Sequence, residues 1–261
     1  MLGASLLLVV ASACSSTAAD VVASSAAGPG IEQLRVEVVG TAPHDPGAFT
    51  EGLELDGGQL YESTGLEGRS AITRGDPATG APQARQELDH ALFGEGVTLA
   101  GDRLWQLTWK NGVAISRDPQ TLAETGRASF DGEGWGLCAQ PDRLVMSNGS
   151  ATLTFRDRTT FAVLGTVDVT AAGTPLTRIN ELECTPDGQV WANVWQTDQI
   201  VRIDPTTGHV TAVVDASGLL TPGQAAAADV LNGIAALPGT DEFLVTGKLW
   251  PTVFTVRFVA A

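Results

Sequence analysis

A three-residue motif recurs five times along this chain of 261 residues, each time at the start of an apolar, strand-like segment. The five copies are Glu51-Gly52-Leu53, Glu95-Gly96-Val97, Trp135-Gly136-Leu137, Asn180-Glu181-Leu182 and Asn232-Gly233-Ile234. Their first residues follow one another at intervals of 44, 40, 45 and 52 positions. A repeat of this length with strand–turn–strand content is typical of a β-architecture repeated around an axis. Such a fold brings equivalent positions of all units to one central place.

Each unit continues with a tight turn and a returning strand. The turns are Asp56-Gly57-Gly58, Gly101-Asp102, Pro141-Asp142, Pro186-Asp187-Gly188 and Pro238-Gly239-Thr240. Asp, Gly and Pro are the residues that such turns require, so each unit begins with a β-hairpin. A second turn joins an outer pair of strands, at Asp76-Pro77, Asp118-Pro119, Asp157 and Asp204-Pro205. The pattern predicts an all-β fold, a five-bladed β-propeller with four-stranded blades.

The two ends of the repeat region predict how the ring closes. The fifth unit stops at its third strand, Val253 to Val259, and the segment Leu34 to Val39 alternates like a strand before the first unit. We expect this N-terminal strand to pair with the last blade and so remove an exposed edge. A β-sandwich is the main alternative, but it would not generate so regular a recurrence.

The N-terminus has the features of an export segment. Residues 1–14 contain a short apolar core, Leu6 to Val10, followed by Ala11-Ser12-Ala13-Cys14, which resembles a bacterial lipoprotein cleavage box. We expect lipidation of Cys14 and a membrane tether, with ordinary signal cleavage near Ala13 as the alternative. A basic segment before the apolar core is missing, since the first Lys or Arg is Arg35. The protein is accordingly expected at the cell surface or in the periplasm, or secreted.

Composition bounds the remaining domain structure and the partners. Residues 15–33 are rich in Ala, Ser and Gly and predict a flexible tether, which leaves residues 34–261 for the propeller. With 15 basic and 30 acidic residues, the net charge of −15 argues against nucleic-acid binding. Cys138 and Cys184 are 46 positions apart, about one repeat, so a disulfide and two free buried thiols both remain open. His44, His90 and His209 lack the spacing of metal ligands.

Hairpin symmetry predicts where side chains converge. The first residues of the five motifs should line one end of the central channel: Glu51, Glu95, Trp135, Asn180 and Asn232. The turns place three further residues opposite them, pairing Glu95 with Trp109, Asn180 with Trp195, and Asn232 with Lys248. Taken singly, each tryptophan fits packing between blades and Lys248 fits a surface charge. Their convergence instead favours a small-ligand pocket with aromatic walls and a few polar groups.

Nine segments in order carry a resemblance to a known family. They are Phe49–Leu53, Tyr61–Leu66 with Gly68–Ser70, Phe93–Gly96, Gln106–Lys110, Glu133–Leu137, Asn180–Glu183, Asn193–Asp198, Leu231–Ala235 and Gly247–Pro251. Over roughly Leu34 to Phe258 the chain resembles the plant and bacterial glutaminyl-peptide cyclotransferases. The resemblance implies a five-bladed propeller that needs no metal or other cofactor. It implies an acyltransferase that converts N-terminal glutamine of peptides to pyroglutamate and releases ammonia; we expect a monomer.

The resemblance also implies roles for particular residues. The family's active-site pattern falls on Phe49, Glu51, Phe93, Glu95, Trp109, Trp135, Asn180, Trp195 and Lys248. We expect Glu95, Asn180 and Lys248 to act in catalysis, and the others, together with Asn232, to contact the substrate. Many family members have Gln at the position of Glu51, and a second carboxylate beside Glu95 would raise the pKa of Glu95.

Two other function classes remain open on the sequence. A lactonase-like propeller would hold a metal ion at the channel, for which Glu51, Asn180 and Asn232 offer oxygen ligands. A non-catalytic propeller on the cell surface or in the periplasm would use the same pocket to bind a ligand. Dependence of activity on calcium would favour the lactonase.

Overall fold

A computed structural model describes residues 30–261 of the protein. The predicted export segment, Cys14 and most of the predicted tether lie outside these residues. The described chain is almost entirely β-structure, with one four-residue helix, α1 (Pro222–Ala225). Within it, no helix is long and apolar enough to cross a bilayer.

Three blades are separate four-stranded sheets, each antiparallel and in chain order. The first contains β2 (Thr50–Asp56), β3 (Gln59–Thr64), β4 (Ala71–Gly75) and β5 (Pro82–Glu87). The second contains β6 (Gly94–Ala100), β7 (Arg103–Thr108), β8 (Val113–Arg117) and β9 (Glu124–Ser129). The third contains β10 (Leu137–Ala139), β11 (Leu144–Met146), β12 (Thr152–Arg156) and β13 (Val163–Asp168).

The remaining strands form one larger sheet that β1 holds together. One run is β16 (Ile179–Cys184), β17 (Val190–Val194), β18 (Gln199–Asp204) and β19 (His209–Asp215), with the short β14 (Thr170–Ala171) and β15 (Thr174–Pro175) beside β19. The other run is β20 (Leu231–Ala236), β21 (Glu242–Gly247), β22 (Thr252–Ala260) and β1 (Glu32–Pro43).

Strand β1 joins the two runs of the larger sheet by pairing with β19 on one side and β22 on the other. It pairs antiparallel with β22, as predicted for the N-terminal strand, and parallel with β19. The parallel pairing was not predicted. Because β1 has a partner on each side over part of its length, the strand edges of β19 and β22 are covered. Strand β1 begins at Glu32, two residues before the predicted start of the domain.

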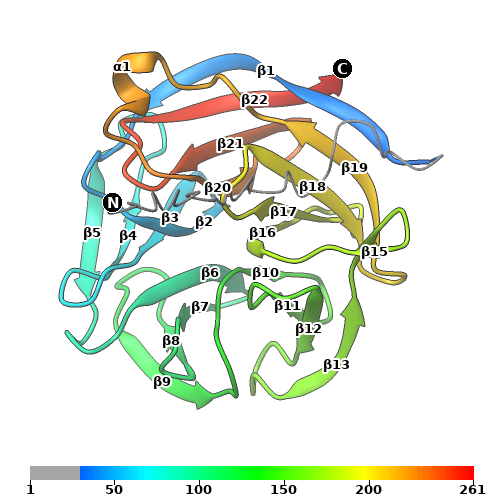
Figure 1. Ribbon diagram of the computed structural model, residues 1–261. Coiled ribbons are helices and arrows are strands. Elements are labelled where there is room, and N and C mark those ends of the chain that lie inside the picture. The colour runs from blue at the N-terminus through cyan, green and yellow to red at the C-terminus, as the bar shows by residue number, and fades with distance from the viewer. Residues whose placement is uncertain (1–29) are drawn as a thin grey trace, which may run out of the picture.

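The first strands of the units contact one another around the centre of the molecule. Strands β2, β6, β10, β16 and β20 each contact the next, and β20 contacts β2 again. Figure 1 shows these strands at the centre, with β5, β9 and β13 at the periphery. The motif glycines permit this approach, because a Cβ at Gly96 would lie 2.6 Å from the Leu137 nitrogen and one at Gly136 would lie 2.1 Å from the Asn180 oxygen.

Apolar side chains fill the spaces between neighbouring sheets. Tyr61 and Ile72 of the first sheet pack with Val97 and Leu104 of the second in one buried cluster. A similar cluster joins Trp191 on β17 to Phe243 on β21, from the two runs of the larger sheet. Burial of these faces is the main stabilising contribution that holds the sheets around the centre.

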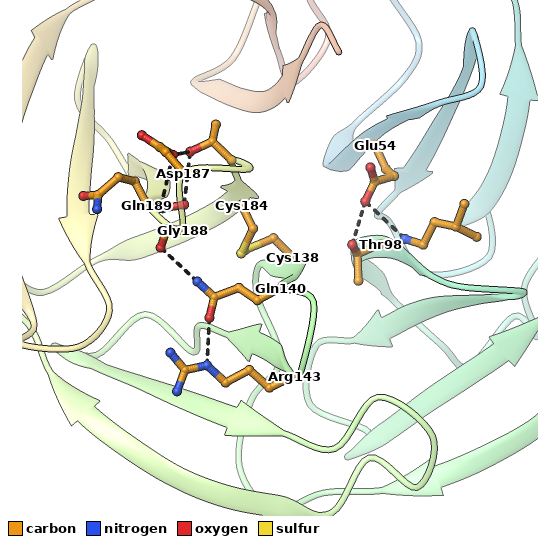
Figure 2. The surroundings of a disulfide bond; sticks show 11 residues. Glu54, Thr98, Cys138, Gln140, Arg143, Cys184, Asp187, Gly188 and Gln189 are labelled. Carbon is orange, nitrogen blue, oxygen red and sulfur yellow. Dashed lines mark hydrogen bonds between the residues drawn. A yellow bond between two sulfur atoms is a disulfide. The ribbon is translucent and has the colours of Figure 1, made fainter. Parts of the chain in front are cut away.

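A disulfide links two of the inner strands. Cys138 on β10 and Cys184 at the end of β16 are joined, with their Cα atoms 5.3 Å apart (Figure 2). The structure thus decides in favour of the disulfide over two free thiols. Close by, Gln140 Nε2 donates to the Gly188 carbonyl oxygen at 3.0 Å, which ties the same two units a second time.

We predict that replacing both cysteines by serine lowers the free energy of unfolding by about 2–4 kcal/mol, because the unfolded chain loses a cross-link spanning 46 positions. Urea unfolding followed by circular dichroism measures the change. Reduced wild-type protein is the matched control and should lose a similar amount. Equal stability of the oxidised, reduced and double-serine forms would contradict the prediction.

Candidate active site

A β-bulge displaces the first motif residues of four inner strands. The strand register shifts between Thr50 and Gly52, between Gly94 and Val97, between Ile179 and Leu182, and between Leu231 and Ile234. These shifts fall on Glu51, Glu95, Asn180 and Asn232. A bulge leaves a residue unpaired and re-aims its side chain. The motif therefore places polar side chains where the regular ladder is interrupted.

Nine of the ten predicted catalytic and substrate-contacting residues line one cavity of about 390 Å³. They are Phe49, Glu51, Phe93, Glu95, Trp109, Trp135, Asn180, Trp195 and Lys248. The cavity is of the size that suits a small ligand or one amino-acid side chain with its backbone. It forms at the central end of the sheets, as the hairpin symmetry predicts.

Asn232 is the exception. It is fully buried, and its Nδ2 donates to the Thr50 carbonyl oxygen at 2.9 Å. It does not line the cavity. The prediction that Asn232 contacts the substrate is therefore corrected: its amide connects β20 to β2 and helps close the ring of inner strands.

An ion pair and a second carboxyl form the polar floor of the cavity. Lys248 Nζ donates to both oxygens of Glu51, at 2.7 and 2.6 Å. The exposed fractions of Glu51, Glu95 and Lys248 are 1%, 5% and 6%. Glu95 Oε2 is buried without a hydrogen-bond partner.

Burial dominates the acid–base properties of these two carboxyls. It raises the pKa of Glu51 to about 7, although the Lys248 ammonium opposes the shift. Burial and then the charge of Glu51 raise the pKa of Glu95 well above its ordinary value. A carboxyl whose pKa lies well above its ordinary value is suited to exchange protons in neutral solution.

Aromatic rings form the walls. Phe49 meets Phe93 edge-on at 6.3 Å between ring centroids, and Phe93 lies 5.5 Å from Trp109. On another side, Trp135 and Trp195 meet edge-on at 5.5 Å. These rings limit the access of water to Glu95, which strengthens electrostatic interactions inside the cavity.

Glu133 orients two of these indoles, a role that the sequence reasoning missed. Its Oε2 accepts from Trp109 Nε1 at 2.8 Å and from Trp135 Nε1 at 3.0 Å. Lys110 covers the Trp109 ring at 3.8 Å and lies 3.7 Å from Glu133. The indole N–H groups of Trp109 and Trp135 therefore both donate to Glu133. The sequence offered one signal for this role, since Glu133 lies two positions before Trp135.

The backbone of Asn180 is fixed while its side chain remains free. Ser147 Oγ donates to the Asn180 carbonyl oxygen at 2.6 Å and accepts from the Gly136 N–H at 2.7 Å. The Asn180 side chain is buried at the cavity wall, and its Oδ1 has no partner. A fixed backbone with an uncommitted amide is an arrangement that can hold a polar group of a ligand.

Four further residues line the cavity without having been predicted: Leu66, Gln196, Asp229 and Val230. Leu66 and Gln196 have left-handed backbone conformations, with φ of 82° and 62°. Such angles are uncommon for residues with a side chain, and neither position carries the glycine that would have marked the turn in the sequence.

The acidic and histidine residues are not arranged as a metal site. Across residues 30–261, no three His, Cys, Asp or Glu side chains are grouped to hold a metal ion. The oxygens of Glu51 already bind an ammonium, where a lactonase would need them for a cation. His44 contacts the Trp250 carbonyl oxygen at 2.6 Å and Glu62 at 2.9 Å, which assigns it a structural role.

Comparison with known proteins agrees with this geometry. The family model for glutamine cyclotransferases matches residues 6–258. The chain belongs to the glutamine cyclotransferase family. It is 38% identical to a glutaminyl-peptide cyclotransferase of Arabidopsis thaliana over 232 residues, which are 87% of this chain and 72% of the relative. It also resembles the crystal structure of Myxococcus xanthus glutaminyl cyclase, with a TM-score of 0.80, 36% identity, and coverage of 88% of this chain and 99% of the other.

A further buried carboxyl, Glu181, lies where the other four motif copies have glycine. It is fully buried, and it accepts from the backbone N–H of Leu53 at 3.2 Å and of Ile234 at 2.9 Å. One side chain of β16 thereby reaches both β2 and β20. Burial raises the pKa of Glu181 well above its ordinary value.

We predict that Glu181→Ala lowers the free energy of unfolding by about 2–6 kcal/mol, because two buried N–H groups lose their acceptor at about 1–3 kcal/mol each. Glu181→Gln keeps one acceptor oxygen and the side-chain volume, so it should lose clearly less. Urea titration of the two variants side by side measures the difference. The bridging role is wrong if the alanine variant is as stable as the glutamine variant.

Proposed function

We propose that this chain converts the N-terminal glutamine of peptides and proteins to pyroglutamate and releases ammonia, as an acyltransferase. The observation that carries the proposal is the unpartnered, buried oxygen of Glu95 in an aromatic-walled cavity that also holds Asn180 and Lys248. Membership of the glutamine cyclotransferase family and the names of both relatives support the same reaction.

The chemistry of this reaction suits such a cavity. The substrate's own α-amine attacks its γ-carboxamide carbon, so both reacting groups belong to one molecule and the cavity needs only to fold them together. A free α-amine titrates at about 7.7–8.0, so little assistance is needed to expose the nucleophile. The harder step is the departure of ammonia, which requires a proton on the leaving nitrogen.

Glu95 is placed to move that proton. We assign it the acceptance of a proton from the attacking amine and its delivery to the leaving nitrogen, for which its raised pKa is suited. Asn180 supplies an uncommitted amide for the carbonyl oxygen. Lys248 has three N–H donors, of which Glu51 takes two, so one remains for the developing negative charge.

The same proposal includes finer features of the fold and its location. The closed cycle of inner strands β2, β6, β10, β16 and β20 supports a five-bladed propeller whose last blade includes β1. The disulfide supports an oxidising compartment and thus export. The proposal also includes lipidation of Cys14, a membrane tether through this residue, and a monomeric state. The lipid anchor is tested by labelling cells with a radioactive fatty acid: the label should appear on the wild-type protein and be absent from Cys14→Ser.

The reaction is tested by incubating the purified wild-type protein with a glutamine-initiated peptide in the presence of a strong chelator. We expect the mass of the peptide to fall by that of one ammonia, and the N-terminus to become blocked. An unchanged peptide would overturn the proposal. Activity that requires added calcium would favour the lactonase-like class instead.

Glu95→Gln tests the assignment of the proton carrier. We expect kcat to fall about 10²–10⁴-fold while KM changes little, because the variant keeps its shape but cannot exchange a proton. Glu87→Gln, on the exposed face of β5, is the matched control and should behave as wild type. Near-normal turnover of Glu95→Gln would remove Glu95 from this role.

A further inference from the structure

A second cavity lies beside the active-site cavity, and the proposed reaction does not use it. This outer cavity measures about 190 Å³ and is lined mainly by β3, β4, β5 and their connections, and by the segment between β1 and β2. Phe49 and Leu66 line both cavities, and both are half-buried. Because only the N-terminal residue of a peptide reacts, the residues after it must extend out of the active-site cavity. The outer cavity adjoins it at these two side chains and can receive them.

The segment from Gly65 to Arg69 leads from one cavity to the other. A Cβ at Gly65 would lie 2.4 Å from the ring of Phe93, so this end of the segment lies directly against an active-site wall. Leu66 follows with a left-handed φ of 82°, and its carbonyl oxygen accepts from the Arg69 N–H and from Ser70 Oγ, each at 2.9 Å. These bonds hold the backbone of Arg69 at a fixed place, three positions from the shared wall.

Two cationic side chains line the outer cavity without a charged partner. They are Arg69, in the connection after β3, and Arg85, on β5. Both are exposed, and neither takes part in an ion pair within residues 30–261. A guanidinium group presents a planar fork of N–H donors that matches the two oxygens of a carboxylate.

The acidic side chains of the same wall are already used locally. Asp45 and Asp76 each accept a hydrogen bond from the backbone N–H two residues later, at 2.8 and 2.9 Å. Glu62 contacts His44 Nε2 at 2.9 Å and accepts from Thr50 Oγ1 at 2.7 Å. None of the three contacts a guanidinium group of the outer cavity, so both arginines remain available to a carboxylate that a ligand brings.

A competing exit lies on another side of the active-site cavity. A third cavity shares Asp229 and Val230 with it and is also lined by Asp198, which would suit a basic peptide. The chain has 30 acidic but only 15 basic residues, so two carboxyl groups beside a cavity are expected by chance far more often than two unpaired guanidinium groups. The outer cavity is therefore the better supported exit.

We propose that the outer cavity is a subsite for the residues that follow the N-terminal glutamine, where Arg69 and Arg85 bind the carboxylate of an acidic side chain. The inference rests on the proposed function and names its favoured substrate class: peptides with Asp or Glu shortly after the glutamine. The two arginines lie outside the cavity in which the bonds change, so they act on substrate binding and leave the chemical step unaltered.

The test compares two tetrapeptides with amidated C-termini, in which the glutamine is followed either by three alanines or by two glutamates and one alanine. The readout is the ratio of kcat/KM for the glutamate peptide to that for the alanine peptide. We expect this ratio to fall about 3–10-fold in the double variant Arg69→Ala/Arg85→Ala, the size that suits two partly exposed guanidinium–carboxylate contacts. The fall should come from KM, since these contacts are the same in the ground state and the transition state.

A matched control separates these contacts from the overall charge of the protein. Arg35→Ala removes an exposed arginine of β1 that lines neither cavity, and it should leave the ratio close to that of wild type. Raising the salt to about 0.5 M should shrink the difference between wild type and the double variant, because exposed charges are screened. Both arginines are exposed, so their removal should leave the circular dichroism spectrum unchanged.

An unchanged ratio in the double variant would overturn the inference. If the ratio instead rises in Asp198→Asn while the double variant stays the same, the peptide leaves through the third cavity. Failure of the proposed function gives a different result, since wild-type protein would then convert neither peptide. Conversion of both peptides with a ratio that ignores Arg69 and Arg85 would leave the function standing and contradict only the subsite.

Discussion

The close approach of the five inner strands is the constraint from which the other features of this structure follow. The strands contact one another at motif glycines, where a Cβ atom would lie within 2.1–2.6 Å of a neighbouring backbone atom at Gly136 and Gly96. At one end of this centre, β-bulges interrupt the regular hydrogen bonding of the inner strands. The bulged residues Glu51, Glu95 and Asn180 line the cavity. The site is thus a consequence of ring closure.

Burying several acidic groups at this centre requires a specific partner for each. Glu51 has the Lys248 ammonium, Glu181 has two backbone N–H groups, and Glu54 accepts from Thr98 Oγ1 at 2.6 Å (Figure 2). Among the buried carboxyl oxygens of residues 30–261, Glu95 Oε2 is the one without a hydrogen-bond partner. A carboxyl oxygen left unpaired in a buried site is costly to folding. Glu95 lines the cavity, so under the proposed function the substrate supplies the missing partner.

Periodicity and turn residues were sufficient to predict the inner strands, the channel mouth and seven residues of the cavity, because motif spacing and hairpin symmetry are local properties. Phe49 and Phe93 were predicted only through the family resemblance. What failed depends on long-range geometry. Three features were not predicted: the parallel pairing of β1 with β19, the acceptance of two indole N–H groups by Glu133, and the hydrogen bond from the Asn232 amide to Thr50. Each joins segments far apart in the sequence or depends on the direction of a side chain. The disulfide stayed undecided, since spacing places two cysteines in equivalent positions without fixing their distance.

The central claim is that the reacting carbon and nitrogen of the substrate meet Glu95 inside the aromatic cavity. A crystal structure of the wild-type protein with a bound pyroglutamyl peptide tests it most directly. The account predicts the lactam ring between the aromatic walls, with its nitrogen within about 2.6–3.2 Å of Glu95 Oε2. A lactam bound in another cavity, or one whose ring lies beyond the reach of Glu95, would contradict it.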